Sequence, residues 1–157
     1  MTRTVYIDLS AKTEEWRLDS VVAMTNGGDT VLIVSSKVKR DARDWLKDQD
    51  GQKRKEAVYV YRLLASFIFL AVGSDLSTID QIVIDDDYPG AGPASAIKNE
   101  LIPLLHRRQG NFKGKQIHFQ RVKGSRADLL ARSVFQSKDR DGRRVTLQDI
   151  IDVWGQR

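Results

Sequence analysis

Residues 4–9 read Thr-Val-Tyr-Ile-Asp-Leu, and residues 81–86 read Gln-Ile-Val-Ile-Asp-Asp. Both stretches are rich in β-branched residues and lack glycine and proline, which predicts two strands. The three central residues of the second stretch are all apolar, as expected of a strand buried inside a parallel sheet. Each predicted strand also reaches an aspartate where its apolar run ends, Asp8 in the first and Asp85 in the second.

The residues after the first strand predict an antiparallel meander. Residues 17–24 and 30–36 are two further extended runs. The Asn26-Gly27 pair between them tolerates the positive φ that a tight hairpin turn requires. The first three strands are therefore expected to pair in the order in which they occur along the chain.

Two helices are expected next. The apolar residues of 40–49 share one face, which predicts a short helix. Residues 57–72 are apolar almost all round, which predicts a helix that is covered on more than one side. A buried core helix is favoured over a membrane span, because Arg62 interrupts this stretch and a span needs ~20 apolar residues.

The rest of the chain predicts three more helices and one more strand. In chain order, the expected elements are a helix from Pro93 to Gly110, a strand over 116–122, a helix over 126–136 capped by Ser125, a polar loop over 139–144 and a helix over 146–154.

This order of elements is that of the ribonuclease H fold, an α/β architecture with a mixed five-stranded sheet and helices on both faces. The first and fourth strands lie side by side in that fold, so Asp8 and Asp85 are expected at neighbouring strand ends. The helix after the fifth strand is expected to bring Asp128 to the same place. The length of 157 residues predicts one such domain over residues 1–157.

The chain also resembles a family of proteins with a ribonuclease-H-like core, a predicted nuclease-type domain of unknown function. Members of that family typically open with Tyr-Ile-Asp-Glu-Ser and finish with an Ala-Asp-Leu-Leu-Ala helix. Residues 6–10, Tyr-Ile-Asp-Leu-Ser, and residues 127–131, Ala-Asp-Leu-Leu-Ala, are similar to these two signatures. The resemblance implies metal-dependent cleavage of nucleic acid.

Carboxylates gathered at one place repel one another unless a cation neutralises them. Mg²⁺ and Mn²⁺ prefer such oxygen ligands, so the expected cofactor is one of these ions, held by Asp8, Asp85 and Asp128. Two such cations can activate a water and stabilise the leaving oxygen of a phosphodiester. Glu56 is expected as a further catalytic acid and Asp86 as a further metal ligand.

Two of these assignments stay open between neighbours or between roles. Asp85, Asp86 and Asp87 compete for one ligand position, and alternation along a strand places Asp85 and Asp87 on a common face. Glu56 also suits the first turn of a helix, where the helix dipole favours a negative charge.

Asp128 has a structural alternative as well. It follows Ser125 at the spacing of a capping box, and it lies one helical turn before Arg132. A role in capping and ion pairing therefore competes with a role as a ligand.

The charge balance favours a polyanionic partner, nucleic acid in this interpretation. Lys and Arg number 26 against 21 Asp and Glu, which gives a net charge of +5. The basic residues form clumps at residues 37–40, 53–55, 107–108, 121–126 and 140–144.

The alternative function is that of a non-catalytic nucleic-acid-binding or scaffolding protein. Leu9 favours it, because the family that the chain resembles has Glu there. The absence of cysteine excludes disulfides and thiolate metal sites, and the first residues contain no secretory signal. The chain is therefore expected to be cytoplasmic, with no membrane partner.

Overall fold

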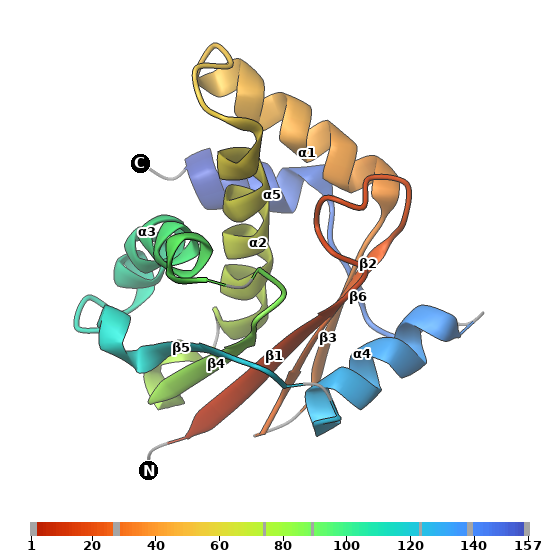
Figure 1. Cartoon of the computed structure of the whole chain (residues 1–157), viewed down its shortest axis with the longest axis vertical. Helices are drawn as coiled ribbons and strands as arrows, with labels where there is room; N and C mark the ends of the chain where they lie inside the picture. The colour runs from red at the N-terminus through yellow and green to blue at the C-terminus, as the bar shows by residue number, and fades with distance from the viewer. Residues whose placement is uncertain are drawn as a thin grey trace.

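The computed structural model describes residues 3–26, 29–73, 75–88, 90–122, 124–137 and 140–155. Its centre is a mixed six-stranded sheet with the order β5-β4-β1-β2-β3-β6 (Figure 1). The strands are β1 (Thr4–Ser10), β2 (Ser20–Thr25), β3 (Thr30–Val34), β4 (Gln81–Asp85), β5 (Ile117–Gln120) and β6 (Arg143–Arg144).

The pairing of the strands brings the first and fourth together. Strands β1, β2 and β3 form the expected antiparallel meander, and β1 runs parallel to β4 on its other side. Strand β5 is parallel to β4 in turn. The carboxyl ends of β1, β4 and β5 therefore meet at one edge of the sheet. Gly27, in the predicted hairpin turn, lies outside the described residues.

The prediction of five strands was wrong by one. Arg143 and Arg144 pair in parallel with Leu32 and Ile33 of β3 and form β6. The segment was interpreted as a polar loop because two exposed arginines carry no alternation of apolar and polar residues. Backbone pairing with the sheet edge, and not side-chain burial, creates this strand.

Five α-helices accompany the sheet among the described residues. They are α1 (Ser36–Gln49), α2 (Glu56–Val72), α3 (Ala91–Arg108), α4 (Arg126–Gln136) and α5 (Leu147–Gly155). The Ser125 cap of α4 is confirmed, since its side chain accepts a hydrogen bond from the backbone N–H of Asp128.

The predicted start of α1 was wrong. The helix begins at Ser36, four residues before the expected start, because the side chain of Ser35 caps it by accepting a hydrogen bond from Val38 N–H. Lys39 and Ala42 are both buried on the inner face of this first half. The basic clump at 37–40 is therefore not wholly a surface feature.

The helices cover both faces of the sheet. Figure 1 shows α4 on one side of the strands and the other four helices on the opposite side. Helix α2 packs with Ile7, Val22 and Ile84 in the main core, which confirms it as a buried helix. Helix α4 packs against β1 and β2 on the other face, where Ala23 is buried. Asp8 alternates with Ile7 along β1 and so belongs to the α4 face.

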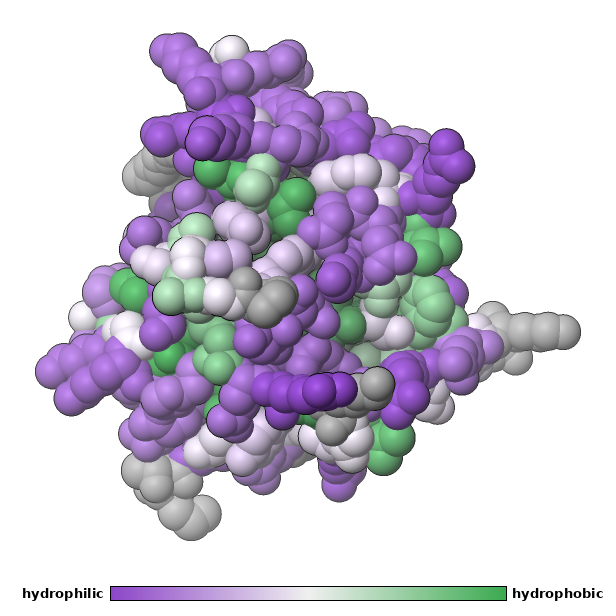
Figure 2. Space-filling model, in the orientation of Figure 1, coloured by the Kyte–Doolittle hydropathy of each residue, from purple (hydrophilic) through white to green (hydrophobic). Residues whose placement is uncertain are grey.

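The surface is mostly polar in the view of Figure 2, with apolar side chains in small groups between hydrophilic ones. Within the described part of the chain, no helix has the length and apolar character needed to cross a bilayer.

Candidate metal centre

Asp8 and Asp85 are held side by side by the pairing of β1 with β4. Ile7 pairs with Ile84 in the parallel register. Asp8, the next residue of β1, therefore lies beside Asp85, the next residue of β4. The side chain of Asp8 is almost fully buried, with 5% of its surface exposed. Asp85 is half-buried, and its Oδ1 accepts a hydrogen bond of 2.9 Å from the backbone N–H of Val122.

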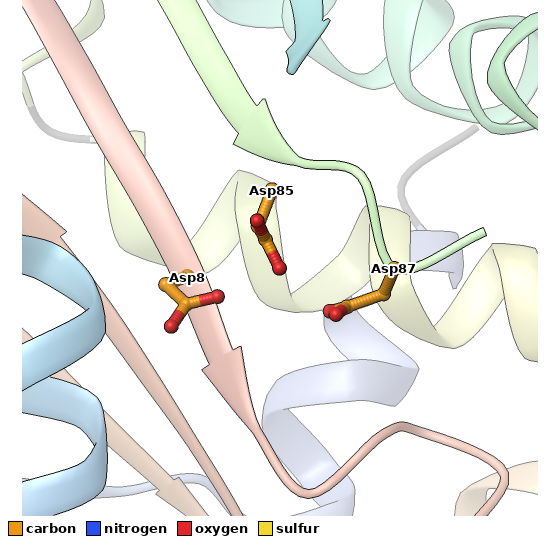
Figure 3. Close-up of side chains that lie close together, drawn as sticks. All are labelled: Asp8, Asp85 and Asp87. Carbon is orange, nitrogen blue, oxygen red and sulfur yellow. The ribbon is translucent and has the colours of Figure 1, made fainter. Parts of the chain in front are cut away.

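Asp87 is the third member of the cluster. It lies in the loop after β4, and its carboxylate turns back toward those of Asp8 and Asp85 (Figure 3). One carboxylate oxygen from each residue lies within 4.8 Å of the other two. We call Asp8, Asp85 and Asp87 the acid triad.

Asp86 does not join this cluster, contrary to the expectation that it is a ligand. It is exposed, while the residues on either side of it are half-buried. Asp86 is therefore outside the group of oxygens that could share one ion, although it lines an adjoining cleft with Asp85 and Asp87. The sequence had indicated a common face for Asp85 and Asp87 but could not decide between the neighbours.

Mutual repulsion and burial make the triad unfavourable in its fully ionised form. Burial is the largest cause that raises the pKa of Asp8, to about 8, and the negative charge of Asp85 is the next. Burial also raises the pKa of Asp87 to about 8, assisted by a hydrogen bond and charge repulsion from Asp85. A carboxyl group keeps its proton near neutral pH when burial and nearby negative charges disfavour its ionised form and no cation compensates for them.

Asp128 lies at the edge of the same site but is held by partners of its own. Its Oδ2 accepts hydrogen bonds from Gly124 N–H at 2.7 Å and from the Arg132 guanidinium at 3.0 Å. These contacts lower the pKa of Asp128, with the Gly124 N–H as the largest cause. The expected ion pair with Arg132 is therefore present, but the carboxylate accepts from Gly124 N–H and not from the Ser125 N–H that a capping box would use, since Ser125 N–H donates to Val122 O. Asp128 also lines the cleft of the triad and interacts with Asp8.

Glu56 is placed away from the triad. It lies in the first turn of α2, is exposed, and its Oε2 pairs with Lys47 Nζ at 2.6 Å. It does not line any of the three clefts that contain members of the triad among the described residues. The expectation that Glu56 completes the site is not met, because the start of α2 is turned toward α1.

The acid triad opens into a cleft of about 290 Å³. The cleft is bounded by the strand ends, by α4 through Asp128 and Arg132, and by the loop after β1 through Lys12 and Glu15. Leu9 contributes to the wall, and its side chain packs against the apolar core.

Lys39 fixes the loop that forms one wall of this cleft. Its side chain is completely buried, and its Nζ donates to Lys12 O at 3.3 Å, Glu15 O at 2.9 Å and Ser20 Oγ at 2.9 Å. Three acceptors satisfy the three N–H donors of the ammonium. Sequence reasoning missed this residue, although Lys39 lies on the same helical face as Ala42 and Leu46, three and seven residues later.

The donor set of the triad suits a hard divalent cation. Three carboxylates from adjacent backbone segments offer up to six oxygens, and Mg²⁺ or Mn²⁺ takes such ligands together with water. Asp8, Asp85 and Asp87 could hold the ion directly, and Asp128 could complete its surroundings. Binding of a cation would also relieve the repulsion that raises the pKa of Asp8.

Comparison with known proteins gives no match to a family model, to a curated protein or to a solved structure.

Proposed function

We propose that this chain is a Mg²⁺- or Mn²⁺-dependent nuclease with a ribonuclease-H-like fold. The observation that carries the proposal is the acid triad: three residues with carboxylate oxygens within 4.8 Å of one another, of which Asp8 is almost fully buried within β1, Asp85 ends the adjacent parallel strand β4 and Asp87 follows it. Such an arrangement is costly for the metal-free fold, and clustered groups with raised pKa values are typical of functional sites.

The strand order supports the ribonuclease-H-like part of the proposal. The order β5-β4-β1-β2-β3, with an antiparallel meander and β1 parallel to β4, is the one expected for that fold. The site also lies at the carboxyl ends of parallel strands, where open α/β sheets commonly bind ligands. Strand β6 adds a short edge to this arrangement without changing the position of the triad.

The role of each acid follows from its contacts. Asp8 is the central ligand in the proposal, since it is the most buried and lies beside Asp85. Asp87 approaches from the loop and completes the triad. Asp128 is engaged by Gly124 and Arg132, so we assign it a supporting position at the cleft. The bound cations would lower the pKa of a water and stabilise the leaving oxygen of a phosphodiester.

The proposal is tested by combining metal binding with cleavage. Wild-type protein is expected to gain melting temperature with Mn²⁺ and to cleave at least one of DNA, RNA or their hybrid. Asp8→Asn is expected to lose both responses while staying folded, because an amide keeps the shape of the carboxylate but not its charge. Glu56→Gln is the matched control, since it removes one acidic charge outside the triad.

The alternative is a non-catalytic nucleic-acid-binding or scaffolding protein. A wild-type melting temperature that ignores Mn²⁺ and Mg²⁺, together with no cleavage of any of the three substrates, would overturn the nuclease proposal in favour of this alternative.

A further inference from the structure

A second cleft, of about 450 Å³, adjoins the cleft of the acid triad. It is lined by Lys12, Asp85, Asp86, Asp87 and Arg121. Three of these residues, Lys12, Asp85 and Asp87, line both clefts, so the two lie next to each other. We call this second one the basic cleft, after Lys12 and Arg121, of which only Arg121 is absent from the lining of its neighbour.

The two cations come from strand ends that flank the triad. Gln120 of β5 pairs with Asp85 of β4, so Arg121 and Asp86 are the next residues of two adjacent parallel strands. Lys12 follows β1 by two residues. The basic cleft is therefore built on the carboxyl ends of β1, β4 and β5, the edge at which open α/β sheets bind ligands.

Neither cation is held in a close ion pair within the described part of the chain, although the charge of Lys12 opposes the rise in the pKa of Asp87. Arg132 shows what such a pair looks like, since it pairs with Asp128 at 3.0 Å. The described residues include no hydrogen-bond or ion-pair partner for the side chain of Arg121, and none for the ammonium of Lys12, which lies 5.9 Å from the centre of the Tyr88 ring. Arg121 is thus available to an anion from solution, and Lys12 lines the same cleft with a charge that also acts on Asp87.

The position of Lys12 is also fixed in advance. Its carbonyl accepts from the buried Lys39 ammonium, and its backbone N–H donates to Glu15 Oε1 at 2.9 Å. Arg40 of the same helix donates to Trp16 O at 2.8 Å, so α1 holds this loop at several points. A cation on a fixed backbone loses less conformational entropy when it binds an anion than one on a mobile loop.

We propose that Lys12 and Arg121 form a phosphate-binding subsite for a nucleic-acid strand whose neighbouring phosphate lies at the acid triad. This inference rests on the proposed function, because the triad defines where the cleaved phosphate lies. A strand that runs across the two adjoining clefts passes from the triad to the two cations. The substrate is then a polynucleotide that contacts the protein through more than one phosphate, and not a lone mononucleotide.

The negative charge of Asp86 would repel a bound phosphate, so its removal should change the affinity in the opposite direction to removal of Lys12 or Arg121. Asp86 is exposed in the same cleft, beside Arg121 in the register of β4 and β5. Removing its charge by Asp86→Asn is expected to strengthen binding of a phosphate backbone at low salt. Removing either cation by Lys12→Gln or Arg121→Gln is expected to weaken it.

The experiment measures the affinity of a short fluorescein-labelled duplex, with Ca²⁺ as the divalent ion, between about 50 and 200 mM salt. Each cation variant is expected to reduce the slope of log affinity against log salt by about 1, and to lower affinity by roughly fivefold to tenfold near 0.1 M salt. Lys115→Gln and Arg54→Gln are the matched controls. Both side chains are exposed, and Lys115 lies before β5, at the opposite edge of the sheet.

The outcomes separate this proposal from the proposed function. Variants at Lys12 and Arg121 that match the wild-type slope, or a wild-type protein that does not bind the duplex at low salt, would overturn the subsite. The Mn²⁺-induced rise in melting temperature is measured on the same variants and is expected to persist. Loss of that rise in Lys12→Gln or Arg121→Gln would also overturn the subsite, because the cations would then act on the triad. Loss of it in wild-type protein concerns the nuclease proposal alone.

Discussion

Asp8 lies beside Asp85 because Ile7 pairs with Ile84 in the parallel register of β1 and β4. Two ionisable groups on adjacent strand ends cannot move apart without breaking that register. The backbone hydrogen bonds and the buried isoleucines thus hold two like charges together. Burial is the largest cause of the raised pKa of Asp8 and the charge of Asp85 adds to it, so the site is expected to respond to substitution, pH and metal.

Asp8→Asn is expected to raise the melting temperature in EDTA. The substitution removes a buried carboxylate that its neighbours repel, and groups clustered for function commonly destabilise the empty fold. For a chain of this size, each kcal/mol of relief corresponds to roughly 2–4 °C. Calorimetry of both proteins at pH 8 measures the effect, with Glu56→Gln as the control. A lower melting temperature for Asp8→Asn alone would contradict the repulsion argument.

Asp87→Asn and Asp86→Asn are expected to differ although the residues are neighbours. Asp87 belongs to the acid triad, while Asp86 is exposed outside it. Loss of Asp87 should therefore weaken Mn²⁺ binding by at least tenfold in calorimetric titration, which corresponds to about 1.4 kcal/mol. Loss of Asp86 should leave the Mn²⁺ affinity within a factor of about two to three. Equal effects of the two substitutions would show that Asp87 has no special position.

The metal-free protein is expected to lose stability as pH rises from about 4 to about 8. The pKa values of Asp8 and Asp87 are raised from 3.8 to about 8, so the folded state binds more protons than the unfolded chain in this window. Their contribution is complete below pH 3.8 and is lost as pH passes 8. The difference in melting temperature between wild type and Asp8→Asn, measured from pH 5 to pH 8 in EDTA, isolates the effect. Asp8→Asn should show the shallower decline, and saturating Mn²⁺ should reduce the decline of wild type.

Asp128→Asn is expected to lower stability, opposite in sign to Asp8→Asn. Its carboxylate accepts from Gly124 N–H and from Arg132, which lower its pKa, so the ionised form stabilises the fold. The expected loss is roughly 0.5–1.5 kcal/mol in the free energy of unfolding, the usual size for such hydrogen bonds. Urea denaturation at pH 7 measures it. A gain in stability would place Asp128 with the repelling acids.

Lys39→Met is expected to lower the free energy of unfolding by about 1–3 kcal/mol, since it leaves the part-buried carbonyls of Lys12 and Glu15 without their donor. Lys37→Met is the matched control. Lys37 is 77% exposed and pairs with the nearby Asp41 on the same helix, so a change within about 0.5 kcal/mol is expected.

The same substitution has a pH signature. Burial is the main cause that lowers the pKa of Lys39 from 10.5 to about 8. The unfolded chain therefore binds more protons between these values, and this group makes wild-type stability rise as pH increases through the window. Lys39→Met should lack that contribution. Identical pH profiles from pH 8 to pH 10 would contradict it.

Local patterns in the sequence determined most of the element order. Short apolar runs without glycine or proline located β1 and β4, and the serine at position 125 located the start of α4. These signals depend on residues a few positions apart, so they can be interpreted without knowing the fold. They also placed Asp8 and Asp85 at strand ends. They did not locate β6, whose two arginines become a strand only by pairing with β3.

The tertiary structure alone decided which acids meet. The selection of Asp87 over Asp86 depends on how the chain leaves β4, and the placement of Glu56 beside Lys47 depends on how α1 packs on α2. The sequence likewise does not decide whether Lys39 is a surface cation, and only the packing of α1 on the loop after β1 shows that its ammonium donates to Glu15 O. A charged side chain stabilises or destabilises the fold according to the residues around it. Those residues are distant in sequence, and strand register and packing bring them together. The sequence alone therefore determined the candidates for the site, and the packing decided its members.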